Sequence, residues 1–207
     1  MTIQDFWDMR SKRYDEQVGT HYADAYRETE ERILRYLAPT DCVLDFACGT
    51  GIVTLPIARR VAQVRAIDLS GEMVRITQEK TAAEGLTNLT VTQTDLFDPS
   101  LREGSFDAVL ACNVLLYIED RAAALARIRA LLREGGVFLS VTDCLGDGFT
   151  RERVQKWWRS HTGKMPYVAF DQQKKLPAEI AAAGFEVLET DVLYPAPPNL
   201  FVAARRL

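Results

Sequence analysis

The 207-residue sequence predicts one α/β domain, built on a doubly wound, mostly parallel sheet with helices on both faces. Short β-branched apolar runs alternate with stretches of helical periodicity, which is typical of parallel sheets whose crossovers are helices. Nearly half of the residues are apolar, and a chain of this length suits a single compact core. The last two strand-like runs are separated by only five residues, which is too few for a parallel crossover, so we expect these two strands to be antiparallel.

The first part of the chain has local signals that mark where elements begin and end. Ser70 is placed to cap the second helix, and Gly85 follows the end of that helix. Pro56 lies in the first turns of the first helix, where a missing amide proton costs least. The expected strands are residues 42–46, 64–68, 89–94, 106–111 and 137–142, and the expected helices are 52–60, 71–84 and 121–133.

The pattern changes after the fifth expected strand. Helices are expected at 151–160 and 177–183, followed by the antiparallel strands 185–194 and 200–204. The helix at 121–133 carries four arginines, which we interpret as a solvated face that suits the helix dipole rather than as a basic patch.

Composition and charge exclude several classes of function. The chain has 29 acidic and 25 basic residues, so its net charge of −4 disfavours a nucleic-acid partner. The cysteines form no C-x-x-C pair, so we expect reduced thiols and no metal site. The sequence begins without a basic segment leading into an apolar one and has no run long enough to span a membrane, so we expect a soluble, cytoplasmic protein. The four cysteines are Cys42, Cys48, Cys112 and Cys144.

Candidate ligand-binding residues follow the strands, because ligands of open α/β sheets bind beyond the carboxyl ends of the strands. The first strand leads into a small-residue turn at 47–51, which fits nucleotides, dinucleotides or a plain tight turn. The dinucleotide fingerprint G-x-G-x-x-G fails in both registers, since Ile52 or Thr54 stands where the last glycine belongs. Asp68 follows the second strand, where it could accept hydrogen bonds from ribose hydroxyls or act as an N-terminal charge on the next helix. Asp95 follows the third strand, where it could accept from an adenine amino group or begin an Asx turn.

Five segments between residues 43 and 142 together resemble one family. They are Val-Leu-Asp-Phe-Ala-Cys-Gly-Thr-Gly, Ala-Ile-Asp-Leu-Ser, Thr-Asp-Leu-Phe, Phe-Asp-Ala-Val-Leu-Ala-Cys-Asn-Val-Leu and Leu-Leu-Arg-Glu-Gly-Gly-Val-Phe-Leu. In this order they are similar to the class I S-adenosylmethionine-dependent methyltransferases. The resemblance implies a Rossmann-like, seven-stranded sheet with an antiparallel last strand, S-adenosylmethionine as cofactor and S-adenosylhomocysteine as product.

The resemblance also implies a set of cofactor-binding residues. The turn would contact the methionyl part, Asp45 would orient that turn or meet the amino group through water, and Tyr14 would cover the amino-acid end. Asp68 would bind the ribose, and the adenine would contact the residues after the second and third strands. The full set is Tyr14, Asp45, Ala47, Gly49, Thr50, Gly51, Asp68, Leu69, Met73, Asp95, Leu96, Cys112 and Asn113.

One position departs from the family's pattern. Ala47 stands where the family usually has its first glycine, and a positive φ there would cost about 1–2 kcal/mol. The resemblance divides the single domain into a helical cap at 1–40, a cofactor-binding core at 41–145, a helical substrate-side insert at 146–184 and a final strand pair at 185–207.

The methyl acceptor is less constrained by the sequence than the donor. Residues 112–116 read Cys-Asn-Val-Leu-Leu, not the Asn-Pro-Pro-Tyr of enzymes that methylate amino groups of bases or side-chain amides. A small-molecule acceptor is therefore expected, with attack by O, N, S or C left open and His21, His161 or a tyrosine as candidate base. Aromatic and histidine side chains that could form the acceptor site, or simply pack in the core, are Trp7, His21, Tyr22, Tyr26, Tyr117, Trp157, Trp158, His161 and Tyr167.

Two alternatives stay open at this point. One is a protein that binds the cofactor without catalysis, for regulation or assembly. The other is an NAD-dependent short dehydrogenase, which is disfavoured because no tyrosine has a lysine four residues on. The expected partners are a small-molecule substrate, no nucleic acid and no membrane, in a monomer or homodimer.

Overall fold

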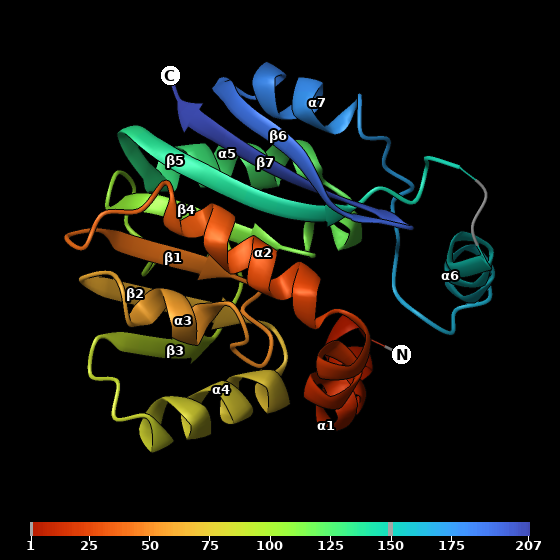
Figure 1. The fold of residues 1–207 in the computed structure, drawn as a ribbon, viewed down its shortest axis with the longest axis horizontal. Coiled ribbons are helices and arrows are strands. Elements are labelled where there is room, and N and C mark those ends of the chain that lie inside the picture. Colours follow the sequence, from red (N-terminus) through yellow and green to blue (C-terminus); the bar gives the residue numbers. More distant parts are fainter. Residues whose placement is uncertain (1, 149–150) are drawn as a thin grey trace.

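A seven-stranded sheet forms the centre of the computed structural model, which describes residues 2–148 and 151–207 (Figure 1). The strand order is β3-β2-β1-β4-β5-β7-β6. Neighbours from β3 to β5 are parallel, whereas β7 is antiparallel to both β5 and β6. The predicted fold class is confirmed. The strands are β1 Cys42–Phe46, β2 Gln63–Asp68, β3 Leu89–Gln93, β4 Phe106–Cys112, β5 Leu132–Asp143, β6 Phe185–Pro195 and β7 Pro198–Arg206.

The final strand pair confirms the argument from loop length. β6 and β7 pair from Phe185 with Arg206 to Pro195 with Pro198, so the connection is tighter than the five residues expected. Both strands are longer than predicted because the pairing continues up to the turn. β7 lies between β5 and β6, which brings Asn199 opposite Asp143 at the carboxyl end of β5.

Helices cover both faces of the sheet, and side chains of β4 alternate between the two cores. Val109 and Ala111 pack with α5 and α7, whereas Ala108 and Leu110 pack with α2, α3 and α4. Figure 1 shows α2 and α3 in front of the sheet and α5 behind it. The bounds are α2 Ala23–Leu34, α3 Thr54–Ala58, α4 Gly71–Ala83, α5 Arg121–Leu131 and α7 Leu176–Ala182.

A third cluster closes the end of the sheet toward which the parallel strands point. It contains Phe6 from α1 (Ile3–His21), Leu116 from the 3-10 helix Leu115–Tyr117, and Met165 after α6 (Arg151–His161). α1 begins at a capping box in which Thr2 Oγ1 accepts from Asp5 N at 3.1 Å and Thr2 N donates to Asp5 Oδ2 at 3.0 Å. Figure 1 shows α1 and α6 at this end of the molecule.

Several predicted boundaries differ from the structure. The first helix was expected at 52–60, but α3 spans only Thr54–Ala58, because φ of +81° at Gly51 delays helical geometry. The helix expected to reach residue 133 ends at Leu131, since Leu132 is extended and already pairs with Phe106. β5 therefore begins five residues earlier than expected. The Ser70 cap and the Gly85 terminus match the structure.

The expectation of a solvated arginine face is wrong for three of the four arginines; the fourth, Arg133, is 61% exposed but lies in β5. The Arg121 side chain is 8% exposed and pairs with Asp171 at 2.7 Å and with Glu179 at 3.0 Å. Arg127 donates to the carbonyl oxygens of Leu96, Asp98 and Leu101, and Arg129 donates to those of Gly184 and Leu207. These side chains connect α5 to other segments through ion pairs and hydrogen bonds, and their partners lie far away in the sequence.

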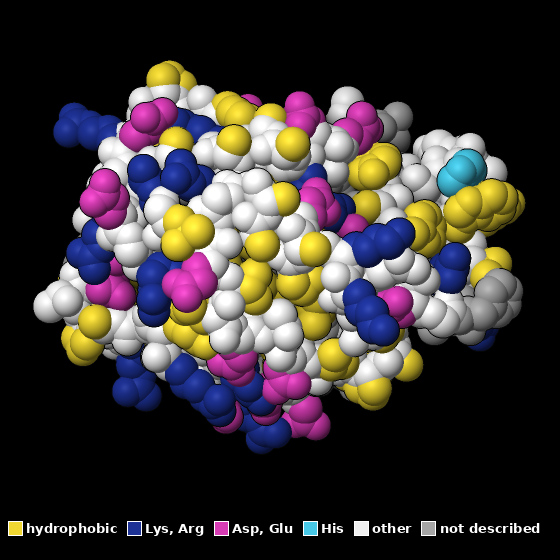
Figure 2. All heavy atoms as spheres, turned by 90° about the horizontal axis from the view of Figure 1, so that it is seen from above, with side chains coloured by type: hydrophobic (Ala, Val, Ile, Leu, Met, Phe, Trp, Pro, Cys, Tyr) yellow, Lys and Arg dark blue, Asp and Glu magenta, His cyan; other side chains and the backbone are white. Residues whose placement is uncertain are grey.

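Two large aromatic side chains are exposed on α6. Trp157 and Trp158 are each about half exposed, and Figure 2 shows hydrophobic side chains gathered at this end of the molecule. Within residues 2–148 and 151–207, no helix combines the length and the apolar character that crossing a membrane requires.

Candidate functional site

The turn after β1 has the left-handed backbone that its small residues permit. φ is +59° at Ala47, +56° at Gly49 and +81° at Gly51. A Cβ added at Gly51 would lie 2.3 Å from Leu55 Cδ1, whereas one at Gly49 would meet no atom within 4 Å. Gly51 is therefore needed for packing against α3, and Gly49 leaves open space for a ligand. Ala47 does adopt the positive φ that was expected to cost about 1–2 kcal/mol.

Asp68 joins this turn to the start of α4. Its Oδ2 accepts from Gly49 N at 2.9 Å, and its Oδ1 accepts from Ser70 N at 2.9 Å. Burial raises the pKa of Asp68, and these two backbone N–H groups oppose the rise. A carboxylate has about four acceptor positions, so two backbone bonds leave capacity for a ligand.

Asp45 lies behind the turn. It is 2% exposed, and Thr54 Oγ1 donates to its Oδ2 at 2.6 Å. Burial raises the pKa of Asp45 to about 6, and the neighbouring charge of Asp68 adds to the rise. Asp45 thus fixes the position of α3 relative to β1.

A first cavity of about 360 Å³ opens next to Asp68. Apolar side chains from α4 and the loop after β3 form one end, including Met73 and Leu96. Asp95 also lines it, while its Oδ1 accepts from Phe97 N at 2.7 Å, which is the Asx turn weighed above. Ten predicted residues line the cavity: Tyr14, Ala47, Gly49, Asp68, Leu69, Met73, Asp95, Leu96, Cys112 and Asn113. Residues not foreseen in its wall are Ile3, Trp7, Phe46, Phe97, Val114, Tyr117, Ile118 and Ala124.

Three predicted residues support the cavity from outside it. Asp45 and Gly51 pack behind the turn as described. Thr50 is 1% exposed; its hydroxyl donates to Asp15 Oδ1 at 2.5 Å, and its carbonyl accepts from Lys80 Nζ at 2.8 Å. Thr50 therefore connects the turn to α1 and α4.

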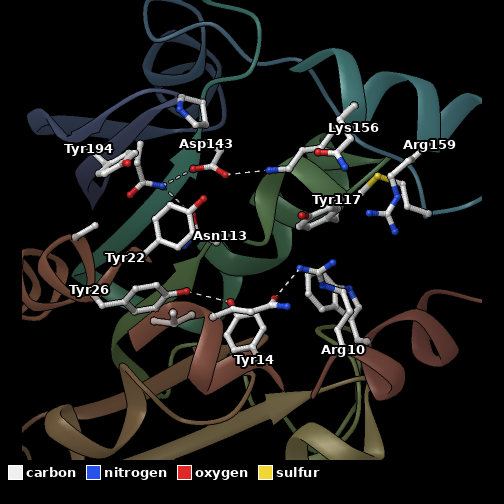
Figure 3. Close-up of a pocket in the computed structure, with 18 of the residues that line it drawn as sticks. Arg10, Tyr14, Tyr22, Tyr26, Asn113, Tyr117, Asp143, Lys156, Arg159 and Tyr194 are labelled. Atoms are coloured by element: carbon white, nitrogen blue, oxygen red, sulfur yellow. Dashed lines mark hydrogen bonds and ion pairs between the residues drawn. The ribbon is translucent and has the colours of Figure 1, made fainter. Parts of the chain in front are cut away.

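A second cavity of about 750 Å³ adjoins the first, and both are lined by Trp7, Tyr14, Asn113 and Tyr117. α1, α2, α6, the end of β5 and the β6–β7 turn enclose it. Figure 3 shows the side chains that point into it.

Hydrogen bonds connect the polar side chains of the second cavity. Asn199 Nδ2 donates to Asn113 Oδ1 at 2.9 Å and to Asp143 Oδ1 at 2.8 Å. Lys156 Nζ lies 3.2 Å from Asp143 Oδ2 (Figure 3). Asn113 has φ of +56°, a conformation that asparagine tolerates better than most residues, and the bond from Asn199 fixes its side chain at the junction of the two cavities.

The tyrosines at the junction are neutral hydrogen-bonding groups. The hydroxyls of Tyr14 and Tyr26 lie 3.0 Å apart. Burial raises the pKa of Tyr14 well above 10 and also raises the pKa of Tyr26. Burial likewise raises the pKa of Cys112 well above its usual value. At neutral pH these groups are therefore phenols and a thiol, not anionic bases.

The expected acceptor-side residues divide into two groups. Trp7, Tyr22, Tyr26 and Tyr117 line the second cavity. Trp157, Trp158, Tyr167 and His161 do not; His161 lies against Trp157 with ring centroids 4.5 Å apart, so it is not placed to act as the base. The side chain of His21 lies outside the described part of the structure.

The charged side chains of the second cavity could not be recognised as site residues from the sequence. They come from α1, α6 and the end of β5, and no local motif links them. Only the tertiary structure brings them together: Arg10, Asp143, Arg151, Lys156 and Arg159. Across the described residues, no group of three or more His, Cys, Asp or Glu side chains is placed to ligate a metal ion.

Comparison with known proteins identifies the family. Residues 43–136 match the family model described as a methyltransferase domain. Demethylmenaquinone methyltransferase of Porphyromonas gingivalis is 30% identical over 165 residues, covering 76% of this chain and 67% of that protein. The chain belongs to the class I S-adenosylmethionine-dependent methyltransferases. An uncharacterized methyltransferase of Mycobacterium tuberculosis is 35% identical over 103 residues, so the match spans about half of each protein, 50% of this one and 51% of that one.

Solved structures agree with this family assignment at the level of the fold. Geranyl diphosphate C-methyltransferase of Streptomyces coelicolor, solved with Mg²⁺, geranyl diphosphate and S-adenosyl-L-homocysteine, superposes with a TM-score of 0.75 at 15% identity. The superposition covers 94% of this chain and 84% of that one.

The methyltransferase uses S-adenosylmethionine as its cofactor, and the first cavity fits that molecule chemically. Open space at Gly49 allows close approach to the backbone, and Asp68 offers acceptor capacity for hydroxyl groups. The buried side chains of Met73 and Leu96 provide apolar surface for a flat ring.

Proposed function

We propose that this methyltransferase is catalytically active and transfers a methyl group to a small molecule bound in the second cavity. One observation carries the proposal: the two cavities share Trp7, Tyr14, Asn113 and Tyr117, so molecules bound in each would meet at these side chains. A volume of about 750 Å³ lies in the range of small-molecule sites, about 300–1,000 Å³. The net charge of −4 also favours a small acceptor over a polyanion.

We assign the first cavity to the cofactor, with the residue roles that the family resemblance implies. Asp68 accepts hydrogen bonds from the ribose, while its backbone bonds to Gly49 and Ser70 keep the carboxylate in place. Met73, with Leu69 beside it, packs on the adenine. Asp95 and Leu96 contact the edge of the ring, and the 47–51 turn contacts the methionyl part. Tyr14 covers the amino-acid end, and Cys112 and Asn113 lie near the sulfur.

The chain itself contributes mainly position and the exclusion of water. The cofactor supplies an activated methyl group on a sulfonium, so the protein must place a nucleophile in line with it. Fixed orientation can contribute about 7–11 kcal/mol to such a step. Among the described side chains, Asp143 is the one carboxylate that lines the second cavity, and Asn199 and Lys156 hold it toward the junction. It is therefore the group best placed to accept a proton from the acceptor.

Two relatives support a small-molecule acceptor. The Porphyromonas relative is named for demethylmenaquinone, and the Streptomyces structure was solved with geranyl diphosphate. Both are small organic molecules, although the attacking atom in this protein, O, N, S or C, is not set by either.

Binding and turnover experiments separate this proposal from its alternatives. Thermal unfolding should shift upward with S-adenosylhomocysteine and not with NAD, because a ligand at about 100 times its Kd adds about 2.7 kcal/mol. Asp68→Asn should lose most of the shift, whereas Glu134→Gln, an exposed carboxylate far from both cavities, should retain it. A full shift in Asp68→Asn would refute the ribose assignment.

Turnover distinguishes an enzyme from a binding protein. Transfer of label from S-adenosylmethionine should be measured against a panel of phenols, carboxylic acids, amines, thiols and enols. Transfer to at least one class, lost in Asp68→Asn, is expected. Normal cofactor binding without transfer to any class would favour the regulatory or assembly alternative and contradict catalysis.

A further inference from the structure

The second cavity is locally cationic in a protein that is acidic overall. Among the described side chains, its wall contains Arg10, Arg151, Lys156 and Arg159 but a single acidic residue, Asp143, while the whole chain has a net charge of −4. Like charges gathered around one cavity repel each other unless an anion binds between them. The first cavity is lined by none of these four cations.

Arg10 has the clearest unmet bonding capacity. Its guanidinium lies over the rings of Phe6 and Trp7, with Cζ 5.5 and 6.0 Å from their centroids. Nη2 makes one long bond of 3.4 Å to Gln17 Oε1. Nε is buried and has no hydrogen-bond partner, and no carboxylate of the described residues pairs with this side chain. Nε faces the protein interior, but Nη1 donates to no described residue and Arg10 lines the cavity, so the terminal N–H groups can donate to a ligand there.

Arg159 extends from α6 into the same cavity. It is partly buried, and none of the acidic side chains that the structure describes forms an ion pair with it. Figure 3 shows Arg159 and Arg10 on the Tyr117 side of the cavity, with Tyr22, Tyr26 and Tyr194 on the other side. The cavity is therefore polarised, with phenol groups at one side and guanidinium groups at the other.

Lys156 has a different role from the arginines. It forms an ion pair with Asp143, and Figure 3 shows its ammonium group directed toward that carboxylate. Its charge is therefore balanced within the protein. The guanidinium groups of Arg10 and Arg159 have planar arrays of N–H donors, which bind carboxylates and phosphates in bidentate geometry.

We propose that the methyl acceptor carries a carboxylate or phosphate group, which Arg10 and Arg159 bind at the side of the second cavity away from Tyr194. This inference rests on the proposed function, because it assigns the acceptor's chemistry at that site. The reacting atom of the acceptor then lies toward Asn113, where the two cavities meet. The cofactor's own carboxylate is not the anion concerned, since neither arginine lines the first cavity.

Calorimetric titration in the presence of saturating S-adenosylhomocysteine tests the proposal. The probes are benzoate, 4-hydroxybenzoate and phenyl phosphate, each compared with a neutral counterpart: benzamide, 4-hydroxybenzamide and phenol. The wild type should bind at least one anion about tenfold more tightly than its neutral counterpart. Arg10→Gln and Arg159→Gln should each reduce that preference, and the double variant should abolish it. Arg60→Gln, an exposed arginine outside both cavities, should retain it.

The outcomes separate the two proposals. If S-adenosylhomocysteine binds to the wild type but no anion is preferred, or if the double variant retains the preference, the anion site is refuted while the proposed function stands. Loss of S-adenosylhomocysteine binding in Arg10→Gln, with normal thermal unfolding, would instead place Arg10 in the cofactor site and overturn its assignment. Failure of the wild type to bind S-adenosylhomocysteine would contradict the proposed function itself. Label transfer to anionic and neutral acceptors then provides the matching kinetic comparison, with KM expected to rise in both variants more than kcat falls.

Discussion

Replacing Asp45 by asparagine should raise the free energy of unfolding relative to the wild type, and this gain should be larger at neutral pH than at acidic pH. Asp45 is 2% exposed, and the one side-chain bond it accepts comes from Thr54 at 2.6 Å. Its carboxyl group faces the negative charge of Asp68 and the thiol of Cys48, and no cation pairs with it among the described residues. Asparagine retains the shape and can still accept from Thr54, but it does not ionise.

The size of the effect follows from the pKa of Asp45, which burial raises from 3.8 to about 6. Between these values the folded protein retains a proton that the unfolded chain has lost, so rising pH lowers the free energy of unfolding. A rise of this size corresponds to about 3 kcal/mol at pH 7. The Asp45→Asn variant does not lose this contribution. Its free energy of unfolding relative to the wild type should therefore increase by about 2 kcal/mol from pH 4 to pH 7, because part of the total is already lost at pH 4.

Urea unfolding of both proteins at intervals between pH 4 and pH 8 measures this difference. Asp68 is present in both proteins, so the difference between them reports the charge of Asp45 together with its repulsion from Asp68. Glu134→Gln serves as a surface control whose difference from the wild type should show no such rise. A constant difference between Asp45→Asn and wild type across this range would refute the reasoning.

Two further pairs of substitutions test the packing of the turn and of α5. Gly51→Ala should lower the free energy of unfolding by about 2–5 kcal/mol, because positive φ costs about 1–2 kcal/mol and a Cβ 2.3 Å from Leu55 Cδ1 adds about 1–3 kcal/mol. Gly49→Ala should incur only the cost of the positive φ, because its Cβ meets no atom. Equal losses of stability in the two variants, measured by urea unfolding, would show that the contact with Leu55 does not matter. Arg121→Gln leaves two acidic partners without their cation and should cost about 3–5 kcal/mol. Arg75→Gln breaks two ion pairs on an exposed helix surface and should change thermal unfolding little. A comparable loss of stability in Arg121→Gln and Arg75→Gln would show that burial does not explain the cost of removing Arg121.

Features that depend on short stretches of sequence could be predicted. The bounds of β1 match the expected 42–46, and Ser70 accepts from Met73 N as an N-cap should. The antiparallel ending followed from a loop too short for a crossover, which is a geometric limit rather than a preference. The residues that follow strands β1 to β4 meet at one cavity because parallel strands bring their carboxyl ends to one edge of the sheet, which is also a geometric limit.

Features that depend on distant partners could not be predicted. The arginines of α5 have the spacing of a solvated face, yet Arg129 reaches Leu207, 78 residues away in the chain. Arg10 and Arg159 look like ordinary surface charges of two amphipathic helices, and only the folding of α1 and α6 over the sheet turns them toward one cavity. Asn199 likewise gains its role from β7 lying beside β5.

A crystal structure of the protein with S-adenosylhomocysteine tests the central claim most directly. We expect the ribose hydroxyls within hydrogen-bond distance of Asp68, the adenine between Met73 and Leu96, and the sulfur directed past Asn113 toward the second cavity. Ligand density in the second cavity instead, or a ribose that does not contact Asp68, would contradict the assignment of the two cavities.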